Sequence, residues 1–188
     1  RQPGDACGDR RVERVLVDRR EARARRERLG EEAAQVQRLR VGGSLTISDG
    51  AGRWCLARLG PTAGAVDVDG PIEVVPRPEP PIAVAFAILK GDRNEWVVQK
   101  LTELGVDRIV PMVAERCVVR WDPAKAARNV GRLRTVAREA SMQSRRCWLP
   151  TVDEVTPFAT VAAEPGAVRA DRGGPGLHTG RLPPLVLV

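Results

Sequence analysis

Short runs of alternating apolar and polar residues dominate the first 75 residues of the chain. Such runs occur at residues 12–17, 45–47, 53–57, 66–68 and 72–75. Asp49-Gly50-Ala51-Gly52 stands between two of them and is typical of a tight turn. Several short strands joined by close turns predict a small β-barrel, which we place at residues 1–76. Residues 19–29, nearly all Arg, Glu and Ala, favour a helix instead.

The pattern changes after a proline-rich segment. The prolines at positions 76, 78, 80 and 81 fit neither a helix nor a central strand, so we expect a stiff linker at residues 77–81. A second domain then covers residues 82–188. Residues 82–89 are a continuous apolar run, typical of a strand buried on both faces. Three further strands are predicted at residues 108–113, 167–170 and 185–188.

Two helices are predicted between these strands. Asp92 and Glu95 have the spacing of a capping box at the start of the first, and Gly105 ends it. Asp122-Pro123 predicts the start of the second, which reaches about Ser144. The inward positions are Val97, Leu101 and Leu104 in the first helix and Ala126, Val130, Leu133, Ala137 and Ala140 in the second. Because strands and helices alternate, we expect an α/β domain with a mainly parallel sheet and helices on both faces.

Positive charge is concentrated in one segment. The chain has 31 Lys and Arg against 24 Asp and Glu, a formal net charge of +7, and 28 of the 31 cations are Arg. Residues 116–146 contain nine cations and two acids, which accounts for as much charge as the whole chain carries. A helix made soluble by charge would be expected to intersperse acids, so phosphate contact is the favoured interpretation. We predict such contacts for Arg116, Arg120, Arg128, Arg132 and Arg145.

Cysteine and histidine are too sparse to form a metal centre. Cys7, Cys55, Cys117 and Cys147 lie far apart, and His178 is the single histidine. We expect reduced thiols, no metal and no histidine-based catalysis. No apolar run approaches the roughly 20 residues that a bilayer requires, and the Arg-rich start lacks the apolar core of a secretory signal. The prediction is a cytoplasmic protein without a membrane partner.

Three local patterns allow a functional interpretation. Lys90-Gly91-Asp92-Arg93 follows a strand and begins a helix, but it lacks the spacing of a dinucleotide or P-loop motif, so a helix cap is favoured over a ligand loop. Trp121 and Trp148 are candidates for stacking on unpaired bases, whereas core packing is expected for Trp54 and Trp96. Glu139, Gln143 and Arg146 are spaced to share one helical face, which is either a solvated Glu–Arg surface or a frame for RNA.

The segments 90–96, 99–107 and 138–150 carry a resemblance to a known family. They read Lys90-Gly91-Asp92-Arg93-Asn94-Glu95-Trp96, then Gln99-Lys100-Leu101-Thr102-Glu103-Leu104-Gly105-Val106-Asp107, then Arg138 to Pro150. In the last segment Glu139, Gln143, Ser144 and Arg146 match a Glu-x-x-x-Gln-Ser-x-Arg signature. Together they resemble the ribosomal RNA small subunit methyltransferases that modify uracil at N(3), a branch of the SPOUT (α/β-knot) superfamily.

This resemblance implies a function and a set of partners. It implies a PUA-like β-barrel followed by a SPOUT domain, a homodimer, and S-adenosylmethionine as the donor for methylation of one uridine of small-subunit ribosomal RNA. Catalysis would then be mostly positioning of the donor and the ring nitrogen. The residues implied to contact RNA or frame the active site are Glu139, Gln143, Ser144 and Arg146, next to Arg145, which the charge pattern predicts as a phosphate contact. Those implied to hold the cofactor are Ala170, Asp171, Leu187 and Val188.

Two departures from the family pattern are also expected. Its later cofactor loops would follow Val188, so we expect a truncated chain with an incomplete knot region and with methylation lost or incomplete. Ala33-Ala34 stands where the family commonly has two histidines. The alternative is therefore a noncatalytic, ribosome-associated RNA-binding protein derived from such an enzyme. A protein-binding scaffold is a third possibility, and it predicts weak RNA affinity that is insensitive to Arg substitutions.

Overall fold

The computed structural model describes residues 13–16, 40–61, 65–170 and 185–187. The chain divides into two compact units, Arg1–Val75 and Pro76–Val188. No helix in the described part of the chain is long and apolar enough to cross a membrane.

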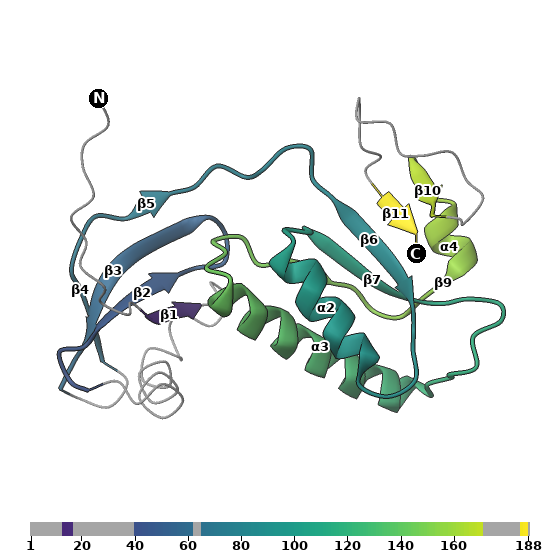
Figure 1. Cartoon of the computed structure of the whole chain (residues 1–188), viewed down its shortest axis with the longest axis horizontal. Helices are drawn as coiled ribbons and strands as arrows, with labels where there is room; N and C mark the ends of the chain where they lie inside the picture. The colour runs from purple at the N-terminus through teal and green to yellow at the C-terminus, as the bar shows by residue number, and fades with distance from the viewer. Residues whose placement is uncertain (1–12, 17–39, 62–64, 171–184, 188) are drawn as a thin grey trace. The chain divides into compact units, whose positions relative to one another are not determined.

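The N-terminal unit contains a five-stranded sheet (Figure 1). Its strands are β1 (Glu13–Leu16), β2 (Ser44–Ser48), β3 (Arg53–Leu59), β4 (Val66–Val68) and β5 (Glu73–Val74). The predicted hairpin is confirmed: β2 and β3 are antiparallel, and the carboxylate of Asp49 accepts from the backbone N–H groups of Ala51 and Arg53 in the turn between them. The predicted helix at residues 19–29 lies outside the described residues.

The predicted barrel is not confirmed. The sheet order is β1-β2-β3-β4, with β5 paired to β3, and no pairing between the outer strands closes it within the described residues. One edge of β3 is shared: residues 57–59 pair with β4, and residues 53–54 pair with β5. The alternation of β3 buries Cys55, Ala57 and Leu59 on one face, as expected for a half-buried antiparallel strand.

The C-terminal unit is built around a parallel sheet of six strands. These are β6 (Ala83–Ala87), β7 (Arg108–Val113), β8 (Thr151–Val152), β9 (Thr156–Pro157), β10 (Ala167–Arg169) and β11 (Leu185–Leu187). The order is β10-β11-β6-β7-β8, with β9 also on β7, and every described pairing is parallel. The last strand of the chain thus lies between β10 and β6. The predicted parallel α/β architecture of this unit is confirmed.

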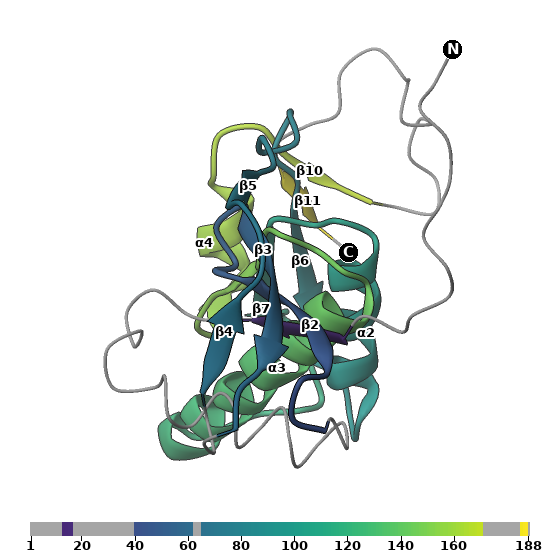
Figure 2. The same cartoon turned by 90° about the vertical axis from the view of Figure 1, so that its left-hand side faces the viewer.

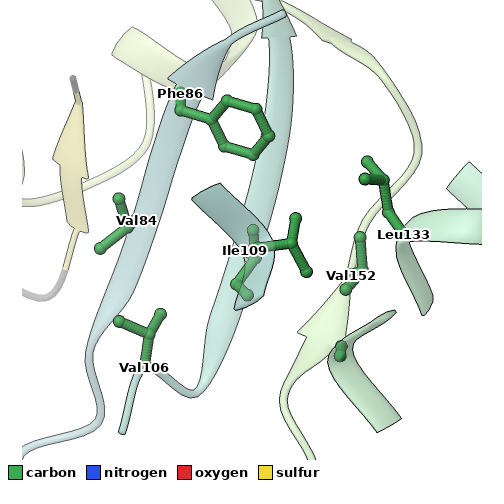
Figure 3. Packing of buried hydrophobic residues seen from close by; sticks show 8 residues of the cluster. Val84, Phe86, Val106, Ile109, Leu133 and Val152 are labelled. Carbon is green, nitrogen blue, oxygen red and sulfur yellow. The ribbon is translucent and has the colours of Figure 1, made fainter. Parts of the chain in front are cut away.

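In the described part of this unit, three helices cover the two faces of the sheet (Figure 1, Figure 2). They are α2 (Arg93–Glu103), α3 (Pro123–Gln143) and the short α4 (Phe158–Ala162). On one face, α2 and α3 bury a core that includes Val84, Phe86, Ile109 and Leu133 (Figure 3). On the other face, Val161 of α4 packs against Ala83, Ala85, Val110 and Met112. Successive residues of β6 therefore point to opposite faces, and both are buried, as the continuous apolar run predicts.

The ends of α3 follow its sequence closely. The side chain of Asp122 accepts from the N–H of Lys125, and Pro123 occupies the first turn, so the predicted cap is confirmed. Val130, Leu133, Ala137 and Ala140 are buried as expected, whereas Ala126 is half-buried. The helix ends at Gln143, and Arg145 adopts a left-handed conformation with φ of 56°.

The predicted inward face of α2 needs correction. Val97 and Leu101 are partly buried and pack against the core as predicted, but Leu104 is 80% exposed. The fully buried residues of the helix are Asn94, Val98 and Thr102. Two of the three buried side chains are polar because each bonds the backbone: the Thr102 hydroxyl donates to the Val98 carbonyl at 2.7 Å, and Asn94 bonds the loop before the helix. The predicted capping box is also wrong, since the Asp92 side chain makes no capping hydrogen bond. Gly105 ends the helix with φ of 97°, as predicted.

The proline-rich segment is held against the C-terminal unit. Arg77 lies 3.5 Å from the Asp107 carboxylate, and its guanidinium stands 5.5 Å from the centre of the Trp148 ring. The same carboxylate accepts from the N–H of Ile82 at 2.9 Å. These contacts fix the entry into β6, so this segment is anchored and is not a free spacer.

Candidate functional site: a basic groove at the carboxyl edge of the sheet

A groove with a volume of about 540 Å³ opens where β6 and β7 end. Its walls come from the β6–α2 loop, the first turn of α2, the loop that follows β7 and the N-terminal half of α3. In open α/β sheets, ligands bind beyond the carboxyl ends of the strands, because the loops there converge from several elements. The groove is therefore the first candidate for a binding site.

Asn94 shapes one wall of the groove. Its amide accepts from the Leu89 N–H at 2.7 Å and donates to the Leu89 carbonyl at 2.8 Å and the Gly91 carbonyl at 3.3 Å. The side chain is 5% exposed, so these bonds satisfy a buried polar group. Asn94 thus fixes the loop that carries Lys90 into the groove.

The opposite wall is tied to the sheet by Cys117. Its thiol sulfur lies 3.3 Å from the Ile88 carbonyl and 3.2 Å from the Val119 carbonyl, and Ile88 in turn donates its N–H to Met112 on β7. The loop then passes into α3 through the Asp122 cap. The hydrogen bond from the Lys125 N–H lowers the pKa of the Asp122 carboxyl and keeps it ionised at the helix N-terminus.

The groove lining is cationic overall. Lys90, Arg120, Lys125 and Arg132 contribute positive charge, against the acids Asp92 and Glu95. The guanidinium of Arg132 pairs with Glu95 at 2.8 Å and thereby connects α3 to α2. An excess of cations beside a partly apolar floor can hold an anionic ligand that also has a nonpolar part.

The structure divides the predicted phosphate-binding arginines into groups. Arg120 and Arg132 line the groove. Arg116, in the loop after β7, and Arg128, on α3, are exposed and form no ion pair in the described part of the chain. Sequence reasoning did not place Lys90 or Lys125 in the site, although the position of Lys90 between a buried strand and a helix was a usable signal.

The far end of α3 has a different environment. Arg146 donates to the carbonyl groups of Thr102 and Val106, each at 2.9 Å, and of Gly105 at 3.1 Å. Its burial lowers the pKa of the guanidinium, although the nearby Asp107 acts in the opposite direction. The assumption that Arg146 shares a helical face with Glu139 and Gln143 is wrong, because the helix ends before it.

The remaining predicted framing residues stay on the surface. Glu139, Gln143, Ser144 and Arg145 are exposed, and the Ser144 hydroxyl donates back to the Ala140 carbonyl. These residues lie at the C-terminal end of α3, which precedes β8 and so faces the amino edge of the parallel sheet. They do not line the groove. Their predicted contact with RNA stays a prediction.

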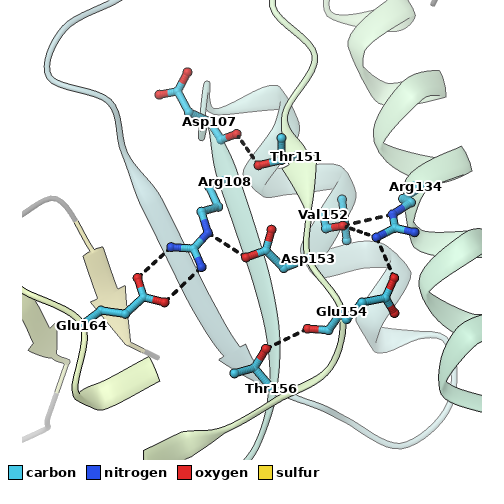
Figure 4. Close-up of polar contacts among 9 residues, drawn as sticks. All are labelled: Asp107, Arg108, Arg134, Thr151, Val152, Asp153, Glu154, Thr156 and Glu164. Carbon is cyan, nitrogen blue, oxygen red and sulfur yellow. Dashed lines mark hydrogen bonds and ion pairs between the residues drawn. The ribbon is translucent and has the colours of Figure 1, made fainter. Parts of the chain in front are cut away.

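An ion-pair cluster stabilises the amino edge (Figure 4). Arg108 donates to Asp153 at 2.7 Å and forms a two-pronged contact with Glu164 at 2.7 and 3.0 Å. The bonds from Arg108 lower the pKa of Glu164, and those to Glu164 and Asp153 raise the pKa of Arg108. Nearby, Arg134 binds the Val152 carbonyl and Glu154. These groups pair with one another, which indicates a structural role.

Two of the four predicted cofactor residues, Ala170 and Leu187, lie at the ends of neighbouring strands. Arg169 pairs with Leu187 in the parallel ladder of β10 and β11, so Ala170 and Leu187 come to the same carboxyl edge as the groove. Asp171 and Val188 lie outside the described residues. Among the described residues, no group of three or more His, Cys, Asp and Glu side chains is arranged to hold a metal ion.

Comparison with known proteins gives consistent results. The model of the RNA methyltransferase domain family matches residues 77–170. The chain is 38% identical over 130 residues to the Mycobacterium bovis protein named ribosomal RNA small subunit methyltransferase E, covering 67% of this chain and 49% of that protein. It is 40% identical over 77 residues to the Bacillus subtilis protein of the same name, covering 41% of this chain and 30% of that protein. The chain thus spans about half the length of the mycobacterial relative, and its match to the Bacillus relative covers a smaller share of that protein.

Solved structures support the fold. A ribosomal RNA small subunit methyltransferase E from Neisseria gonorrhoeae, bound to S-adenosyl methionine, superposes with a TM-score of 0.74 at 21% identity, covering 94% of this chain and 78% of that one. A Legionella pneumophila protein in complex with the same cofactor superposes with a TM-score of 0.77 at 24% identity, with the same coverage.

The family model spans half of the chain, from the anchored proline segment to the end of β10, and the chain therefore belongs to the RNA methyltransferase domain family.

Proposed function

We propose that the protein transfers a methyl group from S-adenosylmethionine to N(3) of a uridine in small-subunit ribosomal RNA. The observation that carries this proposal is the cationic groove at the carboxyl edge of the sheet, in the same unit as the adjoining ends of β10 and β11. The relatives that share this unit are named for methylation of small-subunit ribosomal RNA. The two features would supply RNA binding and cofactor binding on one edge.

The described residues are compatible with this cofactor. Ala170 is exposed and follows β10, and the backbone of Leu187 ends the neighbouring strand, so the two would hold S-adenosylmethionine at paired strand ends. Where the strands end, backbone N–H and C=O groups no longer pair within the sheet, so they can form hydrogen bonds to a ligand. When bound, the cofactor supplies a methyl group on a sulfonium centre. Two solved structures with this fold contain it.

The residues of this chain would mainly position the RNA. Arg120 and Lys125 would contact phosphate groups beside the groove, and Arg116 and Arg128 would extend the cationic surface next to it. Arg132 is held by Glu95 and would contribute less, because its charge is already compensated. Positioning is the main role, since a correctly oriented donor and acceptor remove much of the barrier to transfer. As the methyl group moves from sulfur to N(3), the N(3) proton would pass to water and S-adenosylhomocysteine would leave.

A methyl-transfer assay tests the proposal. The protein is incubated with S-adenosylmethionine carrying an isotopic label in its methyl group and with small-subunit ribosomal RNA, either free or assembled into the subunit. We expect label in the RNA, located at N(3) of one uridine by mass spectrometry of nucleosides. Binding of RNA without transfer of label would support the alternative, a noncatalytic ribosome-associated RNA-binding protein. Failure to bind RNA would contradict both functions.

A further inference from the structure

The groove contains apolar surface that phosphate binding leaves unused. Leu89, Val118, Val119, Trp121 and Leu133 contribute to its lining, and Val118 is 94% exposed. A phosphate group needs cations and N–H donors, and it gains nothing from a valine and an indole beside it. The combination of exposed apolar side chains with Lys90, Arg120 and Lys125 therefore suits a ligand that joins a flat apolar group to an anion.

Trp121 is the residue in the groove best suited to bind a flat group. It is half-buried, and it lies in the loop between β7 and α3 directly before the Asp122 cap, which fixes the backbone next to it. The other three tryptophans have different positions: Trp148 stands under the guanidinium of Arg77, Trp54 lies on β3, and Trp96 is exposed on α2 outside the groove. Tryptophan stacks on any nucleobase, and cations next to the ring add a contact to the neighbouring phosphate.

The groove is displaced from the strand ends that would hold the cofactor. It lies beyond β6 and β7, whereas the cofactor candidates end β10 and β11, and the sheet order is β10-β11-β6-β7. Neighbouring strands lie about 4.8 Å apart, so β11 is separated by roughly 5 Å from β6 and roughly 10 Å from β7. A ligand in the groove would therefore lie beside the methyl acceptor along the RNA.

We propose that the groove binds one unpaired nucleotide that flanks the methylated uridine, with its base against Trp121 and Val118 and its phosphate against Arg120 and Lys125. This inference rests on the proposed function. It assigns the substrate to a class, single-stranded or looped RNA, because a base within a duplex cannot leave its stack to reach the ring without a cost in pairing energy.

The test separates base contacts from phosphate contacts. Affinity is measured by fluorescence anisotropy for a labelled oligouridylate and for an abasic ribose-phosphate oligomer of the same length and charge. We expect the protein to prefer the oligouridylate. Trp121→Ala should weaken its binding by about 5- to 150-fold and leave binding of the abasic oligomer unchanged. Trp121→Phe, which keeps an aromatic ring, should retain most of the affinity.

Two further variants keep the test decisive. Trp96→Ala removes an exposed tryptophan outside the groove and should change neither affinity. Val118→Ser should cause a smaller loss confined to the oligouridylate, and this substitution does not threaten folding because the side chain is almost fully exposed. Equal affinity of the unmodified protein for both oligomers would overturn the inference, as would an equal loss for both in Trp121→Ala.

The same measurements distinguish this inference from the function on which it rests. If the base-dependent binding through Trp121 is present but no methyl group is transferred, the subsite stands and the proposed enzyme activity fails. If methyl transfer occurs and Trp121→Ala has no effect on the base preference, the activity stands and the subsite fails. If neither oligomer nor ribosomal RNA binds, both are wrong.

Discussion

The guanidinium of Arg146 donates to the carbonyl oxygen of Val106 at 2.9 Å, and it connects two segments that are 40 residues apart. Its other bonds reach Thr102 and Gly105, so one side chain satisfies three carbonyl groups where α2 ends. The helix C-terminus is the negative end of its dipole, which favours a cation there. The two most recognisable sequence segments, residues 99–107 and 138–150, are thus joined by a structural contact.

Arg146→Ala should lower the free energy of unfolding by about 2–4 kcal/mol, because it leaves partly buried carbonyl groups without a charged donor. Arg146→Lys should lose less, since it keeps the charge but not the planar fork. Arg128→Ala, an exposed position on α3, serves as the control and should stay within about 0.5 kcal/mol. Urea denaturation measures all three, and a loss for Arg146→Ala as small as that of the control would contradict the structural role.

Glu164→Gln should make stability less dependent on pH under acidic conditions. Because Arg108 lowers the pKa of Glu164 in the folded protein, the ion pair stabilises the fold above the unfolded pKa of about 4.3. This stabilisation is lost as the pH falls from that value through the lower pKa of the folded state. Both side chains are about one third exposed, so we expect a loss near pH 7 of only about 0.5–1 kcal/mol. The free energy of unfolding, measured from pH 7 to 3, should fall less steeply with pH in Glu164→Gln than in Glu115→Gln, the control at an exposed acid. An equal fall in the two variants would show that the Arg108–Glu164 ion pair does not contribute to the pH dependence of stability.

Asn94→Ala should destabilise the C-terminal unit by about 1–3 kcal/mol, because the Leu89 N–H and carbonyl both lose their buried partner. Asn94→Asp should not recover this loss, because its carboxylate could still accept from the Leu89 N–H but would bury a charge beside the Leu89 and Gly91 carbonyl oxygens. Asn129→Ala provides a matched control, as this asparagine lines the groove and its side chain forms no hydrogen bond within the described residues. Thermal denaturation separates the variants, and equal melting temperatures for Asn94→Ala and Asn129→Ala would refute the role of Asn94.

Much of the C-terminal unit could be predicted from local patterns. The apolar run at residues 82–89 contains β6, and Asp122-Pro123 begins α3, because the apolar run and the cap are each visible in a short stretch of sequence. The strands β8 and β9 have two residues each and show no periodicity, so they could not be found, and α4 is too short to carry a helical pattern.

The errors came from tertiary contacts. Leu104 was predicted on the inner face of α2 but is exposed, whereas Asn94 and Thr102 are buried because both bond to the backbone. A periodicity argument treats such polar residues as exposed. The basic segment was counted as nearly free of acids, yet Glu95 and Glu154 pair with Arg132 and Arg134 from other elements. Charge counted along the sequence cannot include partners that folding brings together.

Arginines without an ion-pair partner and arginines already paired should differ in how much they contribute to RNA binding. Arg120→Gln should reduce the slope of log affinity for RNA against log salt concentration by about 0.7 to 0.9, the contribution of one phosphate contact. Arg134→Gln removes the same charge from a guanidinium that already binds Val152 and Glu154, so the slope should be almost unchanged. Long-range attraction alone would weaken both variants equally. Binding curves at four or more salt concentrations provide the slopes, and equal slopes for the two variants would mean that Arg120 does not contact phosphate.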